Sequence, residues 1–437
     1  MSTSLLVGII ALAGFLVLVF AGVPVTVSMA ISGVGGCLFL LRTPTAAFDT
    51  LKASVFSGFT SYTTSVAPMF ILMGLLAMET GIGDDLYDCF QTLTRHQNAG
   101  LAKSTAIVCA IFGAICGSSA ATCSLMCSVA HPQMKRYNYS VELATGTIAS
   151  CCCLSVLIPP SLHLITYGIA AEASVGKLLM AGITTGIFLM ILFLITIEIM
   201  CRINPNNAPG RETKATAKER WKAIRHGGFI EVILVFVLSF GGMFAGWFTP
   251  TEAGCVGFVG MMIVAIIFKR FKWKALFKAM KDTLTMSGMI YCMIAAAKCM
   301  GNMFTYSRIP NAISELITNL DIHRVWVIVI LTLIYFVLGC MIDGIAIILI
   351  TTPIFLPVIK ALGYSDIWFG AYMVVIVGLG AVTPPVGTAC YLTAGCTGES
   401  LTRVFKGCAP FFVAYVVCAI CLGIFPQIAT VLPDLLM

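Results

Sequence analysis

The stretch Gly380–Gly395, GAVTPPVGTACYLTAG, places two adjacent prolines inside a long run without charge. A proline has no N–H to donate and its ring collides with the preceding turn, so it costs about 3 kcal/mol in a helix interior. A second pair lies in Ser155–Gly168, SVLIPPSLHLITYG. One break could be a packing kink whose freed groups bond to nearby Ser and Thr. Two breaks of the same kind favour a functional site.

The composition is that of a membrane protein. Of 437 residues, 59% are hydrophobic and 10% are charged, and the mean hydropathy is +1.00, whereas a soluble domain carries about 25% charged residues. Apolar runs of 18 residues or more recur, as membrane-spanning helices require. We therefore predict an all-α polytopic membrane protein. Residues 1–20 lack a basic start and are interpreted as the first span rather than as a signal peptide.

Two basic loops orient the chain. Arg202–Arg225 holds seven Lys and Arg residues, and Lys269–Lys281 holds six. An excess of Lys and Arg marks cytoplasmic loops. The apolar runs between them, Phe229–Trp247 and Ala253–Phe268, return the chain to the same side. These loops hold most of the basic excess behind the net charge of +7, so no nucleic-acid partner is needed to explain it.

The chain repeats itself. Pro159-Pro160 and Pro384-Pro385 are 225 residues apart, and the same offset pairs Pro132 with Pro357 and Lys135 with Lys360. Such residues are rare in apolar sequence, so these matches predict two homologous halves. The predicted units are a first repeat at 1–200, a basic cytoplasmic linker at 201–228 and a second repeat at 229–437.

Each half is expected to hold five crossings and one re-entrant hairpin. Because five is odd, the second half is inverted relative to the first, and both termini face outside. The first hairpin then opens to the cytoplasm and the second opens outside. The crossings predicted in the first half are 4–20, 24–41, 55–79, 142–170 and 178–200. The hairpins are predicted at 101–134 and 325–357, and the broken helices at 142–170 and 366–396.

Inverted repeats with broken helices are typical of secondary transporters. A broken helix leaves carbonyl and N–H groups unpaired, which a membrane protein tolerates only where they are buried or line a cavity. Carbonyl and hydroxyl oxygens suit Na⁺, and the N-termini of half-helices suit anions. The pattern predicts two Na⁺ sites around a substrate cavity.

Asp343 lies in the middle of an apolar segment, where a carboxylate costs about 2.5–3.5 kcal/mol. Gly344 follows it, as a tight turn would require. One interpretation is a ligand or partner of Na⁺, or a group that binds and releases H⁺. The alternative is a helix cap or an Asp exposed to water.

Three other polar residues invite interpretation. Lys298 could snorkel or pair with a carboxylate. His163, three residues past Pro160, could titrate or cap backbone groups. Glu252 is predicted to be a helix-start carboxylate after Thr249 or Thr251.

The 19 cysteines show no metal-site spacing, so we interpret them as structural thiols, most of them reduced. An intramembrane enzyme would need a nucleophile with a base, or a metal triad. The sequence has no HExxH motif and no GxS motif with a partner His, so we expect no enzyme activity.

Six stretches, in order along essentially the whole chain, resemble the large membrane subunit of tripartite ATP-independent periplasmic (TRAP) transporters. They are APMFILMGLLAMETGI (from Ala67), IFGAICGSSAA (from Ile111), LIPPSLHLITYGIAAEASVGKLLMAG (from Leu157), FTPTEAG (from Phe248), DGIAIILITTPIFLPVIKALG (from Asp343) and VTPPVGTACYLTAG (from Val382).

The resemblance implies Na⁺-coupled import of a small organic acid by an elevator mechanism in the bacterial inner membrane. It also implies two partners, a small four-helix membrane subunit and a periplasmic substrate-binding protein. The alternative is a stand-alone ion-coupled anion symporter or exchanger of the same superfamily. For the motion, we expect 101–170 and 325–396 to be mobile and 4–41, 178–200, 229–268 and 407–430 to form a fixed scaffold.

Carried over by position, the resemblance also implies the site residues. The ion-site residues are Gly117, Ser118, Ser155, Pro159, Asp343, Gly344, Thr383, Pro384 and Thr388. The substrate-binding residues are Ser118, Ser119, Ser161, Gly344, Pro385 and Gly387.

The first half departs from the family pattern more than the second. Thr122 stands where the family usually has Asp, and Cys151–Cys153 begin a stretch that is usually rich in Ser and Thr. His163 replaces a common Pro.

Overall fold

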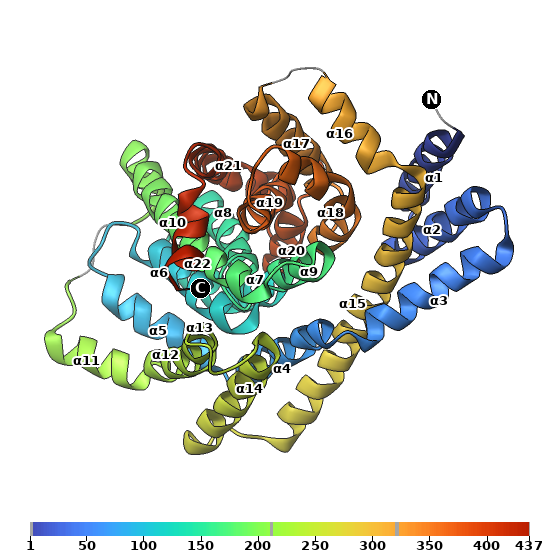
Figure 1. Cartoon of the computed structure of the whole chain (residues 1–437). Helices are drawn as coiled ribbons and strands as arrows, with labels where there is room; N and C mark the ends of the chain where they lie inside the picture. The colour runs from blue at the N-terminus through green and yellow to red at the C-terminus, as the bar shows by residue number, and fades with distance from the viewer. Residues whose placement is uncertain (1–2, 210–212, 320–322, 437) are drawn as a thin grey trace.

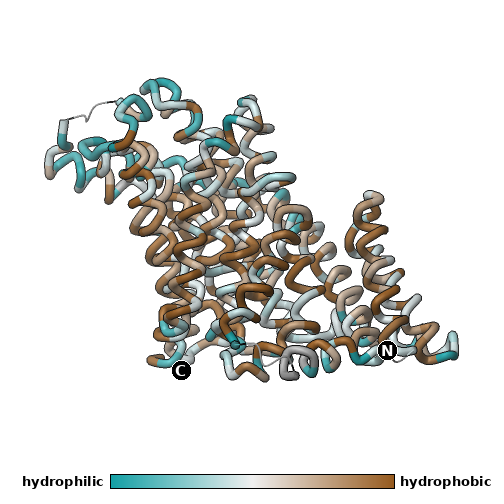
Figure 2. Tube along the Cα trace, turned by 90° about the horizontal axis from the view of Figure 1, so that it is seen from above, coloured by the Kyte–Doolittle hydropathy of each residue, from teal (hydrophilic) through white to brown (hydrophobic). Residues whose placement is uncertain are grey.

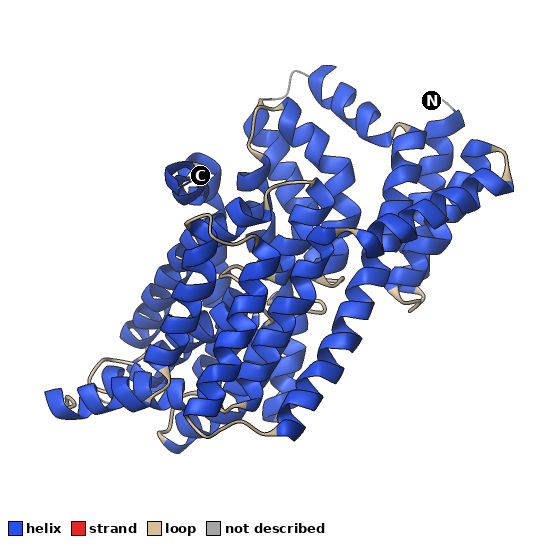
Figure 3. Cartoon of the chain, turned by 60° about the horizontal axis from the view of Figure 1, so that its bottom comes forward, coloured by secondary structure: helices blue, strands red, loops and turns tan. Residues whose placement is uncertain are grey.

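The computed structural model describes residues 3–209, 213–319 and 323–436, and this part of the chain contains helices and no strands (Figure 3). Residues 1–2, 210–212, 320–322 and 437, which belong to the predicted repeats and linker, lie outside the described residues. Within them, seven helices are long and apolar enough to cross a membrane: Thr3–Phe20, Tyr62–Glu79, Val175–Ile203, Pro250–Ile267, Trp273–Ser307, Gly344–Ala361 and Leu401–Ile424. The chain is thus an all-α protein with several apolar helices of spanning length.

The helices follow in two series. The first is α1 (Thr3–Phe20), α2 (Val25–Leu41), α3 (Pro44–Thr60), α4 (Val66–Glu79), α5 (Ile82–Thr94), α6 (Gly100–Cys116), α7 (Ser119–Arg136), α8 (Val141–Cys152), α9 (Leu162–Ala171) and α10 (Val175–Ile203). The second is α11 (Ala217–His226), α12 (Phe229–Phe236), α13 (Gly242–Phe244), α14 (Pro250–Ile267), α15 (Trp273–Ser307), α16 (Ile309–Asn319), α17 (Arg324–Gly339), α18 (Gly344–Ala361), α19 (Asp366–Ala381), α20 (Thr388–Thr397), α21 (Leu401–Ile424) and α22 (Gln427–Leu436). Short turns of other helix types lie at Tyr62–Ser65, Cys153–Val156, Pro205–Asn207 and Val237–Gly241.

An order of five helices occurs twice. A helical hairpin, two short helices separated by a break and one longer helix appear as α6–α10 and again as α17–α21. The corresponding helices start at residues 100 and 324, 119 and 344, 141 and 366, 162 and 388, and 175 and 401. The inversion of the second half relative to the first stays a prediction.

The predicted crossing at 55–79 begins later in the structure, since the helix of spanning length is Tyr62–Glu79. Helix α3 ends at Thr60, Ser61 has extended backbone, and a 3₁₀ turn at Tyr62–Ser65 leads into α4. The Ser65 hydroxyl donates to the Tyr62 carbonyl at 2.5 Å. Side-chain bonds of this kind compete with the helix, so a run of Ser, Tyr and Thr interrupts it.

Most of the helices form two bodies, which Figure 1 shows side by side. The bundle is α6–α10 with α17–α22, and the arm is α1–α4 with α14 and α15. Helix α15 packs along α2, α3 and α4. A Cβ on Gly33 of α2 would lie 2.9 Å from the Met300 backbone nitrogen, so the small residue allows close packing in the arm.

The predicted scaffold role of 178–200 and 407–430 does not fit the packing. These segments lie in α10 and α21, and both helices pack within the bundle. A Cβ on Gly146 of α8 would collide with the backbone of Gly407 of α21, and a Cβ on Gly407 would collide with the carbonyl oxygen of Glu142 of α8. The Phe193 ring of α10 contacts the Tyr415 ring of α21 with centroids 5.2 Å apart. Hydropathy alone could not separate these long helices from those of the arm.

The basic loops meet an acidic amphipathic helix. Arg270 pairs with Asp85 of α5, and Arg95, which directly follows α5, pairs with Glu219 of α11 at 3.0 Å. The Thr216 N–H donates to Glu219 and, together with Arg95, holds the pKa of that carboxyl below its usual range. Figure 2 shows hydrophobic residues along the middle of the helices and hydrophilic ones toward their ends. Helix α5 was not predicted as a separate element because only one of its faces is apolar.

Candidate functional site

Ser161 organises the first break. Between the 3₁₀ turn that ends at Val156 and the start of α9, residues 157–161 are not helical. The Ser161 Oγ accepts a hydrogen bond from the Leu164 N–H at 3.1 Å and donates to the Val156 carbonyl. The Ser155 hydroxyl donates to the Cys152 carbonyl at 2.6 Å. Nearby hydroxyls thus bond to part of the backbone that the break leaves unpaired, as expected if the break were only a packing kink. Each hydroxyl oxygen still has lone pairs that can face an ion.

The tip of the first hairpin packs directly on this break. Gly117 has φ +59°, and a Cβ there would collide with the Pro160 carbonyl oxygen. A Cβ on Gly113 would lie 2.7 Å from the Ser155 Cα. Ser118 caps α7 by accepting from the Ala121 N–H at 3.4 Å. The structure therefore brings the first tip and the first break together.

The second break likewise contacts the tip of its own hairpin, but it is more exposed than the first break. The N–H groups of Val386 and Gly387 donate to the carbonyl of Cys340, near the second hairpin tip, at 3.2 and 3.4 Å. The Thr383 hydroxyl donates to the Leu379 carbonyl at 2.7 Å. All of 151–160 is buried at the first break, whereas residues 384–386 and 388 are exposed.

Asp343 is exposed and caps α18, since its Oδ2 accepts from the Ile345 N–H at 3.1 Å. It makes no hydrogen bond with Thr383 or Thr388 in the part of the chain that the structure describes. The cap is the role that this geometry shows, and a role in ion binding stays a prediction.

Each hairpin also contacts the other half of the chain. A Cβ on Gly344 would lie 2.5 Å from His163 Nε2, so the ring of His163 on α9 packs at the second tip. Cys123 Sγ on α7 lies 3.1 Å from Thr393 Oγ1 on α20. Each hairpin thus contacts its own break and also the half-helix that follows the other break, so these elements form one interlocked unit at the centre of the bundle.

An ion in this unit would depend on oxygen donors. Among residues 3–209, 213–319 and 323–436, no group of three His, Cys, Asp or Glu side chains could hold a metal ion. The breaks and tips instead offer carbonyl and hydroxyl oxygens, which are the ligands that hard cations prefer.

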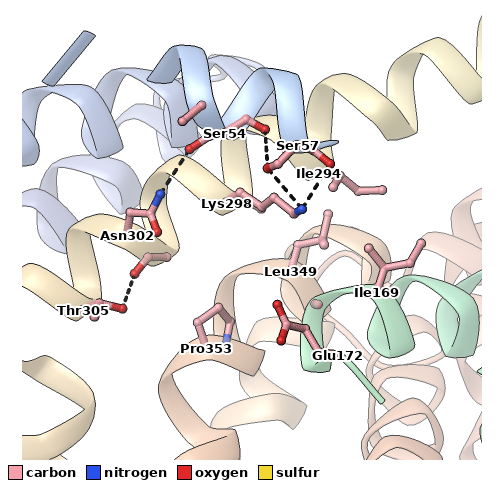
Figure 4. Close-up of a pocket in the computed structure, with 14 residues that line it drawn as sticks. Ser54, Ser57, Ile169, Glu172, Ile294, Lys298, Asn302, Thr305, Leu349 and Pro353 are labelled. Atoms are coloured by element: carbon pink, nitrogen blue, oxygen red, sulfur yellow. Dashed lines mark hydrogen bonds between the residues drawn. The ribbon is translucent and has the colours of Figure 1, made fainter. Parts of the chain in front are cut away.

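A cavity of about 490 Å³ separates the arm from the bundle (Figure 4). On the arm side, the Lys298 Nζ donates to the Ser57 carbonyl and Oγ at 3.4 and 3.3 Å, and the Asn302 amide donates to the Ser54 Oγ at 3.2 Å. None of the predicted ion-site or substrate-binding residues lines it. Lys298 was noted from the sequence as a polar residue in an apolar segment, whereas Ser54, Ser57 and Asn302 were not predicted to lie at a site. Their i, i+3 and i, i+4 spacing on two apolar helices was the available signal.

The predicted role of Glu252 is confirmed. The Thr249 Oγ1 accepts from the Glu252 N–H at 3.3 Å, and the Glu252 carboxylate accepts from the Thr249 N–H at 2.7 Å. This reciprocal capping box starts α14.

Residues 12–428 match the family model described as "Tripartite ATP-independent periplasmic transporter, DctM component". The chain belongs to this family. The resemblance predicted from the sequence motifs is confirmed.

The C4-dicarboxylate TRAP transporter large permease protein DctM of Pseudomonas aeruginosa is 30% identical over 403 residues, which cover 92% of this chain and 93% of that protein. The ectoine TRAP transporter large permease protein TeaC of Halomonas elongata is 29% identical, over 96% of this chain and 97% of that protein. The sialic acid TRAP transporter large permease protein SiaM of Vibrio cholerae is 24% identical, over 97% of each. These relatives are transporter permeases, which confirms that the chain is not an enzyme.

A solved structure shares the fold at lower identity. The YdaH transporter of Alcanivorax borkumensis superposes with a TM-score of 0.65 at 13% identity, over 89% of this chain and 90% of that one. The DctM-type TRAP family, together with the several apolar helices, makes the chain a multi-pass membrane transporter. The family also implies a tripartite system.

Proposed function

We propose that the chain is the transport subunit of a Na⁺-coupled importer of a small organic acid in the bacterial inner membrane. It works with a small four-helix membrane subunit and a periplasmic substrate-binding protein. The observation that carries the proposal is the interlocked unit, in which two hairpin tips close on two broken helices. Broken helices near mid-membrane supply the carbonyls and helix ends that secondary transporters use for coupling ions and substrates.

Two Na⁺ ions are proposed, one at each break. Gly117, Ser118, Ser155 and Pro159 surround the first ion, and the contact between the first tip and the first break supports this grouping. The second ion lies near the second break and tip. Its residues are Asp343, Gly344, Thr383, Pro384 and Thr388.

The substrate is proposed to bind between the tips and the breaks. Its residues are Ser118, Ser119, Ser161, Gly344, Pro385 and Gly387. The names of three relatives refer to C4-dicarboxylates, ectoine and sialic acid, which are small molecules that carry a carboxylate. A carboxylate is suited to the N-termini of the half-helices, where the helix dipole is positive.

The proposed transport motion is a sliding of the whole bundle along the arm, an elevator. The arm touches the first hairpin closely, because a Cβ on Gly74 of α4 would lie 2.5 Å from the Cys116 Cα. On the side of the second hairpin, the cavity lies between arm and bundle, and α15 meets α18 beside it at Gly301 and Pro353. Sliding along such an interface would leave the packing inside the bundle unchanged.

Reconstitution of the full chain with both proposed partners tests the function. We expect radiolabelled substrate to accumulate in the vesicles only with an inward Na⁺ gradient and with the substrate-loaded binding protein outside. Omission of the binding protein should leave little uptake of free substrate. Robust uptake by this chain alone would refute the tripartite mechanism and favour a stand-alone symporter. Equal uptake in K⁺ with only a pH gradient would refute Na⁺ coupling.

A further inference from the structure

The cavity between arm and bundle has walls of opposite charge. Lys298 and Glu172 line the cavity: Figure 4 shows Lys298 on the arm side, with its Nζ facing Ser57, and Glu172, which follows the last residue of α9, on the bundle side. Serine, threonine and asparagine side chains accompany Lys298 on the arm wall. The bundle wall is otherwise mainly apolar and includes Ile169, Leu349 and Pro353.

Neither charge is neutralised by another side chain among the residues that the structure describes. The hydrogen bonds of the Lys298 ammonium go to the neutral carbonyl and hydroxyl of Ser57. Neither Lys298 nor Glu172 takes part in an ion pair within the described residues, and the Glu172 carboxylate accepts no hydrogen bond there. The Lys298 ammonium, whose partners are neutral, gains from an anion, and the exposed Glu172 carboxylate across the cavity gains from a cation.

We propose that this cavity is an entry site for a small zwitterion, whose carboxylate binds Lys298 while its cationic group faces Glu172. The inference rests on the proposed function and narrows its substrate to organic acids that also carry a positive charge. A dianion would meet Lys298 at one end but be repelled by Glu172 at the other. The apolar wall between the charges suits a short methylene chain. Ser54, Ser57 and Asn302 add hydrogen-bonding groups beside the carboxylate.

A series of four-carbon probes tests the charge pattern at nearly constant size. The full chain in lipid nanodiscs is titrated with 4-aminobutanoate (zwitterion), succinate (dianion), butyrate (monoanion) and butylamine (cation). We expect 4-aminobutanoate to bind at least about fivefold more tightly than each of the others, since it alone satisfies both charges.

Two variants assign the charges to residues. Lys298→Gln should weaken 4-aminobutanoate and butyrate alike, by about tenfold, because a charge-assisted hydrogen bond is lost. Glu172→Gln should leave butyrate binding intact or stronger and make it equal to that of 4-aminobutanoate. Lys52→Gln, on the exposed face of α3 outside this cavity, is the matched control and should change nothing.

The inference would be overturned if succinate bound more tightly than 4-aminobutanoate. It would also be overturned if none of the four probes showed saturable binding. A phospholipid that native mass spectrometry finds on the wild type but not on Lys298→Gln, with no probe bound, would also overturn it and assign the cavity to a lipid headgroup. The uptake assay keeps the proposed function separate. Na⁺-driven uptake without a zwitterion preference rejects the inference alone, whereas the expected binding pattern without Na⁺-driven uptake rejects the proposed function.

Discussion

Gly117 should be irreplaceable at the first hairpin tip for two separable reasons. Its backbone is left-handed, with φ +59°, and alanine in that conformation costs about 1–2 kcal/mol. Its missing side chain also leaves room for the Pro160 carbonyl oxygen, a backbone atom of the first break. Forcing extra volume into a packed interior adds about 1–3 kcal/mol. We therefore expect Gly117→Ala to lower the free energy of unfolding by about 2–5 kcal/mol.

Two other glycines separate these contributions. Gly363 has φ +78°, and a Cβ there would have nothing within 4 Å, so Gly363→Ala tests backbone strain alone and should cost about 1–2 kcal/mol. Gly113 lies inside α6, where a Cβ would be 2.7 Å from the Ser155 Cα. Gly113→Ala therefore tests the collision without the left-handed backbone.

Thermal unfolding of the purified variants and Na⁺-driven uptake in vesicles give the two measurements. Gly117→Ala and Gly113→Ala should reduce uptake by at least about tenfold, because each moves the tip off the break, whereas Gly363→Ala should transport like the wild type. A Gly117→Ala variant as stable and as active as Gly363→Ala would refute the argument that tip and break act through direct contact.

Two further substitutions address single side chains. Asp343→Asn keeps the cap on the Ile345 N–H and should fold normally while impairing uptake severely, whereas transport at the wild-type rate would leave Asp343 as a structural cap. Ser161→Ala removes both the α9 cap and the bond to the Val156 carbonyl and should lower the free energy of unfolding by about 1–3 kcal/mol, measured by thermal unfolding; an unchanged melting temperature would contradict this.

Much of the fold was predictable because its signals are local. Paired prolines end helices, Gly117 and Ser118 mark a tight turn that starts a capped helix, and apolar runs give the spans. The helix start at Thr249 and Glu252 follows from side-chain chemistry within four residues. These features need no knowledge of distant contacts.

The predictions that failed depended on contacts between distant parts of the chain, or on polar side chains within apolar segments. Whether α10 and α21 belong with the bundle depends on Gly146 and Gly407 meeting across the fold, and hydropathy does not encode such a pairing. The interruption at Ser61 depends on a few side-chain bonds that a long apolar window averages away. In the candidate site, the tip and break residues were named from motifs. The cavity wall around Lys298 was missed because its hydroxyl partners lie more than two hundred residues away in sequence.

Motion of the bundle against the arm is the central claim, and a disulfide across their interface tests it most directly. A Cβ on Gly301 of α15 would lie 3.7 Å from the Cβ of Pro353 on α18, within the range of about 3.5–4.5 Å that disulfides require. The pair Gly301→Cys and Pro353→Cys is introduced into a chain whose native cysteines are replaced. The control chain keeps only Cys390 and Cys408, whose sulfurs are 3.5 Å apart within the bundle.

Oxidation should abolish Na⁺-driven uptake by the chain with Cys at 301 and 353, and a reductant should restore it. Oxidation of the control chain should leave uptake unchanged, because its link joins parts of the same moving body. Uptake at the unlinked rate by a chain fully cross-linked between α15 and α18 would contradict the elevator motion.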